Sequence, residues 1–169
     1  MTAPRSRPAR RGGASNAASF AFVAAVSFGA VIAALVSQHA FDMQPCPWCV
    51  LQRLMFVTIG AFALLGLVWR GAAGSRVAAT FALLLAIAGV ATAFWHYFVA
   101  ARSASCNLTL ADRIVGATQL DRLLPDVFEA RASCADAAVD LFGVPYPMWA
   151  ALAFVICAVA LLRILRASV

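Results

Sequence analysis

Four long apolar segments constrain this chain more than any other feature. They run from about 17–36, 50–69, 77–99 and 148–165. A helix needs about 20 apolar residues to cross a hydrocarbon core about 30 Å thick, and each segment approaches or exceeds that length. Because a backbone in lipid must satisfy its own hydrogen bonds, continuous runs of this length indicate helices. The sequence therefore predicts an all-α membrane protein, an up-down bundle of four transmembrane helices.

The composition agrees with a lipid environment and argues against nucleic acid as a partner. Of the 169 residues, 64% are hydrophobic and 12% are charged, whereas roughly a quarter of the residues are charged in soluble proteins. The net charge of +6 comes from arginines, since the chain has no lysine. They are scattered between apolar segments, a pattern that sets topology in membrane chains. The predicted surroundings are the lipid bilayer, with no nucleic acid bound.

The arginines also predict the orientation. We interpret residues 1–16 as a flexible cytoplasmic tail, and 17–36 as a retained helix, because this apolar stretch is longer than the usual 7–15 residues of a signal peptide. With both termini in the cytoplasm, most arginines lie inside, as the positive-inside rule requires, and every acidic residue lies outside. The loops 37–49 and 100–147 then emerge together on the outer side. We expect a multi-pass protein of the bacterial inner membrane with periplasmic loops.

The strongest local motif is Cys46-Pro47-Trp48-Cys49, at the outer start of the second segment. C-x-x-C holds two sulfurs close enough to make and break a disulfide, and a helix start favours a thiolate. Pro47 suits a first helical position. Zinc binding is one alternative, but the sequence offers no second C-x-x-C or His pair to complete a tetrahedral site, so no metal site is predicted. A structural disulfide remains a second alternative.

Arg53 follows this motif with helical spacing. Cys46, Cys49 and Arg53 stand at i, i+3 and i+7, so a helix that begins near Pro47 stacks them on one face. An arginine inside an apolar helix is costly unless it has a partner or reaches the interface. One interpretation is that it snorkels to the headgroups. The other is that its charge stabilises Cys49 as a thiolate and supports negative charge on an electron acceptor. Gln52 is a further candidate hydrogen-bond donor.

A second cysteine pair, Cys106 and Cys134, brackets the long outer loop. A disulfide closing this loop would stabilise the fold by several kcal/mol in the chain-entropy model. A shuttle pair that accepts electrons from a soluble dithiol is the alternative. The loop also contains apolar residues at helical spacing, in a short amphipathic helix that Pro125 could open. Its apolar face could lie on the membrane or pack against the bundle. The fifth cysteine, Cys157, lies within an apolar segment and is predicted to act as a small apolar residue.

Taken together, these features resemble the DsbB disulfide bond formation proteins over roughly residues 20–165. The resemblance rests on the C-x-x-C motif with an arginine four residues later, on four spans with both ends inside, and on the second cysteine pair. Three shorter runs add to it, at 124–128, 141–143 and 147–149.

This resemblance implies a role for each cysteine. Cys106 would be attacked by the thiolate of a soluble periplasmic DsbA-like oxidant, and Cys134 would be its paired cysteine. Cys46 would exchange with Cys106. Cys49 would deliver electrons to a quinone, ubiquinone or menaquinone, beside Arg53. His96, near the outer end of the third segment, is a candidate to bond a quinone carbonyl.

Energetics independently favour a quinone. An oxidant of the DsbA type has a potential near −120 mV, so its acceptor must be more oxidising than a thiol buffer. A four-helix membrane chain without a flavin or nucleotide motif has the lipid-soluble quinone at hand. The predicted activity is a quinone-dependent thiol oxidoreductase that reoxidises a soluble dithiol. Two alternatives stay open: a vitamin K epoxide reductase-like disulfide-forming protein, and a non-catalytic membrane protein with two structural disulfides.

Overall fold

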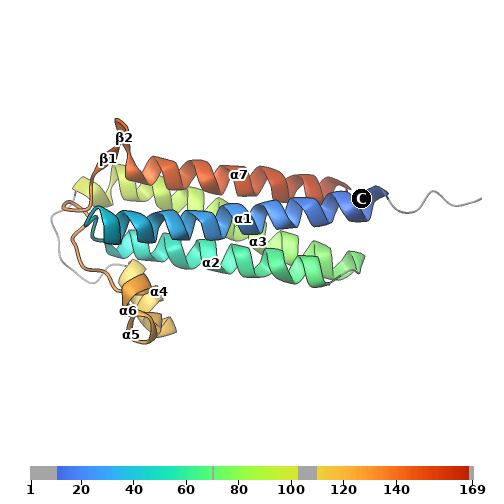
Figure 1. The fold of residues 1–169 in the computed structure, drawn as a ribbon, viewed down its shortest axis with the longest axis horizontal. Helices are drawn as coiled ribbons and strands as arrows, with labels where there is room; N and C mark the ends of the chain where they lie inside the picture. The colour runs from blue at the N-terminus through green and yellow to red at the C-terminus, as the bar shows by residue number, and fades with distance from the viewer. Residues whose placement is uncertain (1–10, 70, 103–109, 168–169) are drawn as a thin grey trace, which may run out of the picture.

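The computed structural model describes residues 11–69, 71–102 and 110–167, with side chains from Asn16 onward. Four long helices lie side by side in it (Figure 1). They are α1 (Arg11–Ala40), α2 (Pro47–Val68), α3 (Ala72–Phe98) and α7 (Tyr146–Ala167). Each is long and apolar enough to cross a membrane. The predicted all-α fold with four membrane-spanning helices is confirmed.

The helices are longer than the apolar segments that predicted them. α1 begins at Arg11, within the segment 1–16 that was predicted to be a flexible tail, and residues 1–10 lie outside the described part of the chain. α2 begins at Pro47, so the C-x-x-C motif forms its first turn. Hydropathy shows where a helix must be apolar, whereas the backbone hydrogen bonds continue into the polar flanks.

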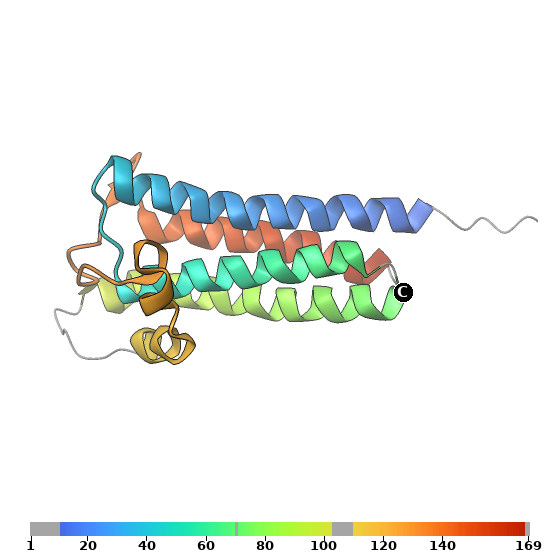
Figure 2. The same ribbon diagram turned by 60° about the horizontal axis from the view of Figure 1, so that its bottom comes forward.

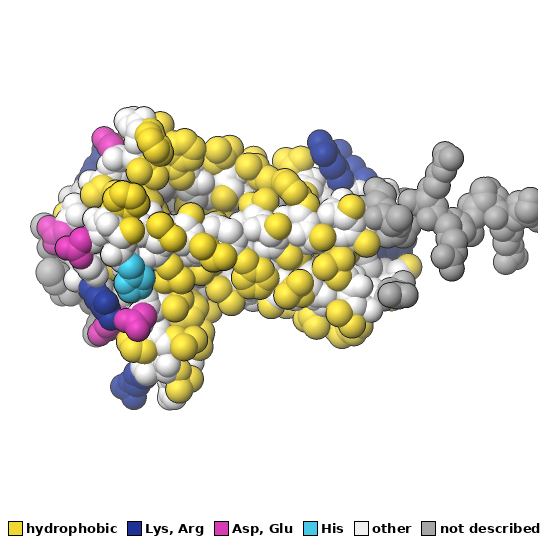
Figure 3. All heavy atoms as spheres, viewed as in Figure 1, with side chains coloured by type: hydrophobic (Ala, Val, Ile, Leu, Met, Phe, Trp, Pro, Cys, Tyr) yellow, Lys and Arg dark blue, Asp and Glu magenta, His cyan; other side chains and the backbone are white. Residues whose placement is uncertain are grey.

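The bundle closes because each long helix packs against two others. α1 and α3 each contact both α2 and α7. In the core, the Phe154 ring stacks on Phe56 with ring centroids 3.9 Å apart. The same ring lies against α3 at Gly89, where any Cβ would collide with it, so a glycine is needed for this close approach. Apolar side chains cover the length of the bundle and charged side chains gather near its two ends (Figure 3), as expected of a protein surrounded by lipid.

A smaller layer of structure covers one end of the bundle, where α1 and α3 end and α2 and α7 begin. We call the residues 41–46, 100–102 and 110–145 the loop layer. Its elements are the 3-10 turn η1 (Ala100–Arg102), the helices α4 (Leu110–Thr118), α5 (Leu120–Leu123) and α6 (Pro125–Phe128), and the hairpin β1 (Asp140–Leu141) and β2 (Val144–Pro145). Figures 1 and 2 show α4–α6 projecting from the side of the bundle beside the start of α2.

The predicted amphipathic helix of the long loop consists of two single turns, α5 and α6. The break falls at Leu124, which has φ −136° and ψ 66°, because the residue before a proline is disfavoured in the helical region. Pro125 opens α6, as predicted. Phe128 is buried and packs with residues of α2, whereas Leu123 and Leu124 stay exposed. Part of the apolar face therefore packs against the bundle. α4 was not predicted.

Candidate redox site

The C-x-x-C motif forms the start of α2. Cys46 is the N-cap residue, with extended φ −87° and ψ 168°, and its sulfur accepts a hydrogen bond from the backbone N–H of Cys49 at 3.4 Å. Pro47 occupies the first turn, where its missing N–H leaves no helical bond unmade. The Sγ atoms of Cys46 and Cys49 are 3.0 Å apart. Two sulfurs this close can form and break a disulfide with little movement of the backbone.

The surroundings of the two cysteines differ. The side chain of Cys46 is fully buried, and its Sγ lies 3.4 Å from Nε2 of His96 in α3. Its thiol also hydrogen-bonds with that of Cys134 from the long loop. Cys49 is half-buried and borders a cavity between α1, α2 and α7. Cys46 therefore faces two other titratable groups of the protein, and Cys49 faces a space that a ligand can fill.

Backbone hydrogen bonds bring Cys134 to this position. The carbonyl oxygen of Pro45 accepts the N–H groups of Arg131 at 2.9 Å and of Ala132 at 3.2 Å. Just beyond them, the Ser133 hydroxyl donates to Asp136 at 2.6 Å and closes a local turn around Cys134. Because these bonds join the segment before Cys134 to the segment before Cys46, residues 88 positions apart in the sequence meet at their sulfurs.

The hydrogen bond between Cys46 and Cys134 has opposite effects on the two thiols. It lowers the pKa of Cys134, whose sulfur is the acceptor. It raises the pKa of Cys46, which donates to Cys134 and to Cys49, and burial adds to that increase. Cys134 is therefore the more acidic thiol of the two. A thiolate beside the sulfur of a C-x-x-C pair is the arrangement that disulfide exchange requires.

The cavity beside Cys49 has a volume of about 290 Å³. Its walls are mostly apolar and include several alanines of α1 and α7 and the ring of Phe56. Besides Cys49, the polar side chains that border it include Ser37, Gln44, Gln52, Arg53 and Tyr146. A largely apolar cavity with a few converging polar groups is typical of a small-molecule site.

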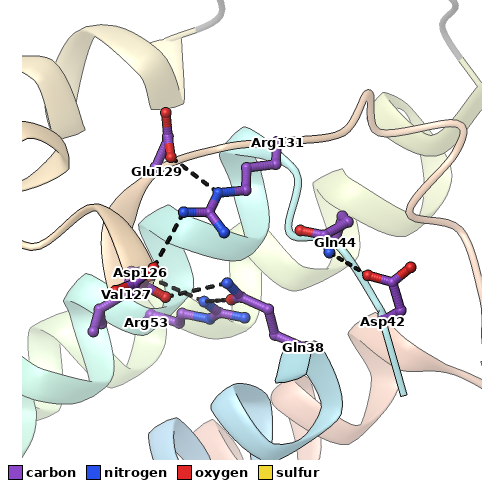
Figure 4. Close-up of polar contacts among 8 residues, drawn as sticks. All are labelled: Gln38, Asp42, Gln44, Arg53, Asp126, Val127, Glu129 and Arg131. Carbon is purple, nitrogen blue, oxygen red and sulfur yellow. Dashed lines mark hydrogen bonds and ion pairs between the residues drawn. The ribbon is translucent and has the colours of Figure 1, made fainter. Parts of the chain in front are cut away.

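Arg53 is buried, with 5% of the residue exposed, so it does not snorkel to the headgroups. Its guanidinium donates to Gln38 Oε1 at 2.6 Å, to the Val127 carbonyl at 3.0 Å and to the Ala34 carbonyl at 3.3 Å. Gln38 in turn donates to the Asp126 carbonyl at 3.2 Å. Figure 4 shows Arg53 and Gln38 between α1, α2 and the turn of α6. The hydrogen bonds of Arg53 and Gln38 to the carbonyls of Val127 and Asp126 hold α6 against the end of the bundle.

All three acceptors of Arg53 are neutral. Within the described residues, the ion pairs are those of Arg131 with Asp126 and Glu129, and no carboxylate pairs with Arg53. A buried cation without a counter-ion is unfavourable, and a negative charge placed nearby is correspondingly stabilised. Arg53 and Cys49 border the same cavity. Negative charge is therefore stabilised both on the Cys49 thiol and on a ligand bound in the cavity.

The structure brings most of the predicted site residues together. Cys46, Cys49 and Arg53 lie at one end of the bundle, but Cys46 does not border the cavity, since an N-cap residue lies outside the helical repeat. His96 borders Cys46 and is not among the residues that line the cavity, and its contact with a quinone carbonyl stays a prediction. Cys106 lies outside the described residues. Cys157 is buried in the core, 3.7 Å from the hydroxyl of Ser27.

Gln38 is the residue that sequence reasoning missed. It is 2% exposed and bonds Arg53. The available signal was an uncharged polar residue just after an apolar segment, at the same predicted end of the bundle as Arg53.

Fold and site together define a class: a four-helix membrane protein with a C-x-x-C thiol pair at one mouth of the bundle and a further cysteine in contact with it. Residues 16–164 match the family model described as "Disulfide bond formation protein DsbB". The chain belongs to the DsbB family. It is accordingly a multi-pass bacterial membrane protein and an oxidoreductase of disulfide bond formation. Membership of this family disfavours the alternative of a vitamin K epoxide reductase-like protein.

Curated relatives agree with this family. The chain is 34% identical over 156 residues to Disulfide bond formation protein B of Ralstonia nicotianae, covering 88% of this chain and 92% of the relative. It is 35% identical over 138 residues to the protein of the same name from Burkholderia pseudomallei, covering 81% and 82%. The Herminiimonas arsenicoxydans protein of that name is 31% identical over 142 residues, covering 83% and 89%.

Proposed function

We propose that this protein reoxidises a soluble periplasmic DsbA-like dithiol and passes the electrons through its cysteines to a membrane quinone beside Cys49. The observation that carries this proposal is the cavity that Cys49 and Arg53 share. A redox-active thiol, a buried positive charge and an apolar space meet there, at the depth of a membrane-spanning helix. The loops that carry the cysteines would face the periplasm.

The residues around the cavity fit a quinone. The apolar walls suit a hydrophobic ring, and its carbonyl oxygens need hydrogen-bond donors. Gln52 offers one: it is 5% exposed, and its Nε2 atom has no hydrogen-bond partner among the described residues. An unsatisfied buried donor costs about 1–3 kcal/mol, which an acceptor in the cavity would remove. Arg53 is the second donor, and its charge would stabilise a reduced, more negative ligand.

The first exchange would take place in the long loop. The thiolate of the partner attacks a Cys106–Cys134 disulfide at Cys106, and the second thiol of the partner then resolves the mixed disulfide. The partner leaves oxidised, and its two electrons and two protons remain on Cys106 and Cys134. This assignment of Cys106 follows the family resemblance.

The second exchange would run through Cys46. The thiolate of Cys134 attacks Cys46 in the Cys46–Cys49 disulfide, the S–S bond breaks, and Cys49 leaves as a thiolate beside Arg53. This step is supported by the contact between Cys134 and Cys46. Cys106 then attacks Cys134 and restores the loop disulfide, so both electrons rest on Cys46 and Cys49. A quinone, when bound, supplies a two-electron, two-proton acceptor. In this scheme Cys134 exchanges with Cys46, whereas the family resemblance implied an exchange of Cys46 with Cys106.

The decisive experiment measures quinone reduction by the purified protein in detergent, with a reduced DsbA-like dithiol and either ubiquinone or a menaquinone analogue. We expect turnover by the wild type and by Cys157→Ala, whose thiol lies in the core. Cys49→Ala should reduce turnover at least about 100-fold, because it removes the thiol that faces the cavity.

A second variant tests the cavity itself. Gln52→Leu should raise the KM for quinone about 2–10-fold, the worth of one neutral hydrogen bond, and leave exchange with the dithiol unchanged. If neither quinone is reduced by folded protein with an active partner, the proposal is refuted, and two structural disulfides become the better account.

A further inference from the structure

Three potential metal ligands meet at the buried side of the C-x-x-C motif. The ligand atoms of Cys46, Cys49 and His96 all lie within 4.8 Å of one another. His96 comes from α3, 47 residues after Cys49 in the sequence, so the spacing of the chain does not reveal it. The sequence argued against zinc because it showed no further ligand near the C-x-x-C motif. The fold supplies that ligand in His96.

We propose that Cys46, Cys49 and His96, when the two cysteines are reduced, form a binding site for a thiophilic divalent cation of the Zn²⁺ class. Two thiolates and an imidazole are the ligands that zinc prefers, and a three-residue set leaves a fourth position open. With Zn–S bonds of about 2.3 Å and tetrahedral angles, the two sulfurs should stand about 3.8 Å apart. They are 3.0 Å apart in the structure, so a small rotation of the Cys49 side chain suffices.

Charge balance favours a divalent cation in this position. Binding releases one proton from each thiol, so two thiolates neutralise the cation and no net charge is buried. His96 binds through Nε2, the atom that already lies 3.4 Å from the Cys46 sulfur, and keeps its proton on Nδ1. Among the described residues Nδ1 has no acceptor. Because such an acceptor orients a histidine ligand and raises its basicity, the affinity should be lower than that of structural zinc sites.

The site would exist in one redox state only. A disulfide between Cys46 and Cys49 has no thiolate to offer, so the oxidised protein should not bind. If the proposed function is correct, a bound cation would hold the reduced pair and stop electron delivery from Cys49, which makes the site inhibitory. The binding itself needs neither quinone nor partner.

The test uses the full-length protein in detergent, reduced with a phosphine and freed of quinone and partner protein. Cobalt(II) is the probe, since a cobalt–thiolate bond gives a near-ultraviolet charge-transfer band and a tetrahedral site gives strong visible bands. We expect one cobalt per protein, complete displacement by zinc, and no bands for the disulfide form. The zinc affinity follows from competition with a chromogenic chelator.

Matched variants assign the ligands. His96→Ala should weaken zinc binding at least about tenfold, as expected for the loss of a ligand. His39→Ala removes the other histidine of the chain, which is exposed at the end of α1, and should bind like the wild type. Cys157→Ala should also bind like the wild type, because its thiol lies in the core. Far-ultraviolet circular dichroism checks that each variant is folded.

Several results would overturn this inference: no thiolate band with folded, reduced protein, equal binding by the oxidised form, or unchanged affinity in His96→Ala. None of them affects quinone reduction, which is measured without added metal. Conversely, loss of the quinone activity would leave the binding result standing, so the two proposals fail separately.

Discussion

Cys46 and Cys49 belong to the same helical turn, yet they contact different parts of the molecule. Cys46 is buried against His96 of α3 and Cys134 of the loop layer. Cys49 borders the cavity with Arg53. One sulfur of the pair is therefore placed to exchange with a cysteine of the protein, while the other borders a cavity that a small molecule can fill.

The difference arises from the N-cap. Cys46 has extended backbone angles, so its side chain does not follow the helical repeat that places Cys49 and Arg53 on one face. Its sulfur turns back over the first turn of α2 and accepts the N–H of Cys49. A C-x-x-C motif at a helix start thus gives two thiols that stay within bonding distance but face different neighbours.

The largest effect should come from removing the sulfur on the cavity side. In Cys49→Ala, Cys46 has lost its disulfide partner, so oxygen can oxidise the neighbouring thiols of Cys46 and Cys134 to a disulfide, and no Cys49 thiol remains to displace Cys134 from Cys46. We expect a disulfide between Cys46 and Cys134 to accumulate in most molecules of air-oxidised protein. Peptide mapping under non-reducing conditions measures it. Wild-type protein, which should keep Cys46 paired with Cys49, is the control, and a free Cys46 in the variant would contradict the assigned contact.

Arg53 should give the next largest effect. Arg53→Ala removes the charge at the cavity and the bonds to Gln38 and Val127. A hydrogen bond to a charged group is worth about 1.5–3 kcal/mol, so quinone reduction should fall about 10–150-fold. Arg53→Lys keeps the charge and should recover part of the rate. Arg166→Ala, at the far end of α7, is the control and should leave the rate unchanged.

The same substitution should loosen α6. Hydrogen exchange of residues 126–128 is expected to rise in Arg53→Ala, because their carbonyls lose the contacts with Arg53 and, through Gln38, with α1. Unchanged protection there, together with a normal quinone rate, would mean that Arg53 neither anchors the loop layer nor acts at the cavity.

Hydropathy and local chemistry predicted much of this structure. The lengths of the apolar segments were sufficient for the four helices, and Pro47 marked the start of α2. Pro125 marked the start of α6 but not the break before it, because the apolar spacing continues through Leu124. The polar ends of the helices were missed for a similar reason, since hydropathy does not report where backbone hydrogen bonds stop.

The site was only partly predictable. Cys49 and Arg53 are joined by a local spacing, which a sequence shows directly. The contacts of Cys46 with His96 and Cys134 depend on how α3 and the loop layer pack, and the bonds to the Pro45 carbonyl come from backbone atoms that carry no sequence signal. For that reason the contacts of Cys46 with Cys134 and His96 were not predicted.

A moderate effect is expected on the acidity of Cys134. Its pKa is lowered from an ordinary value of 9.0 because Cys46 donates a hydrogen bond to it. The thiolate should therefore persist to a lower pH than that of an ordinary cysteine and be lost as the pH falls through the lowered pKa. Alkylation of Cys134 by iodoacetamide, followed by mass spectrometry against pH, measures this titration in the reduced protein.

Removal of the donor should reverse the shift. In Cys46→Ala, the pKa of Cys134 should return toward its ordinary value, and alkylation at pH 7 should slow several-fold. Cys49→Ala leaves the donor in place and serves as the matched control. Equal alkylation profiles for all three proteins would mean that Cys134 is not controlled by Cys46.

The smallest effect is expected at Arg131, where side chain and backbone can be separated. Its guanidinium pairs with Asp126 and Glu129 on the surface, and exposed pairs of this kind contribute little. Its N–H donates to the Pro45 carbonyl. Arg131→Ala should therefore leave the yield of the Cys46–Cys134 disulfide, measured in the Cys49→Ala background, within about twofold. Arg131→Pro removes the N–H as well and should lower that yield clearly more. If Arg131→Ala lowered the disulfide yield as much as Arg131→Pro, the ion pairs rather than the backbone hydrogen bonds would hold Cys134 beside Cys46.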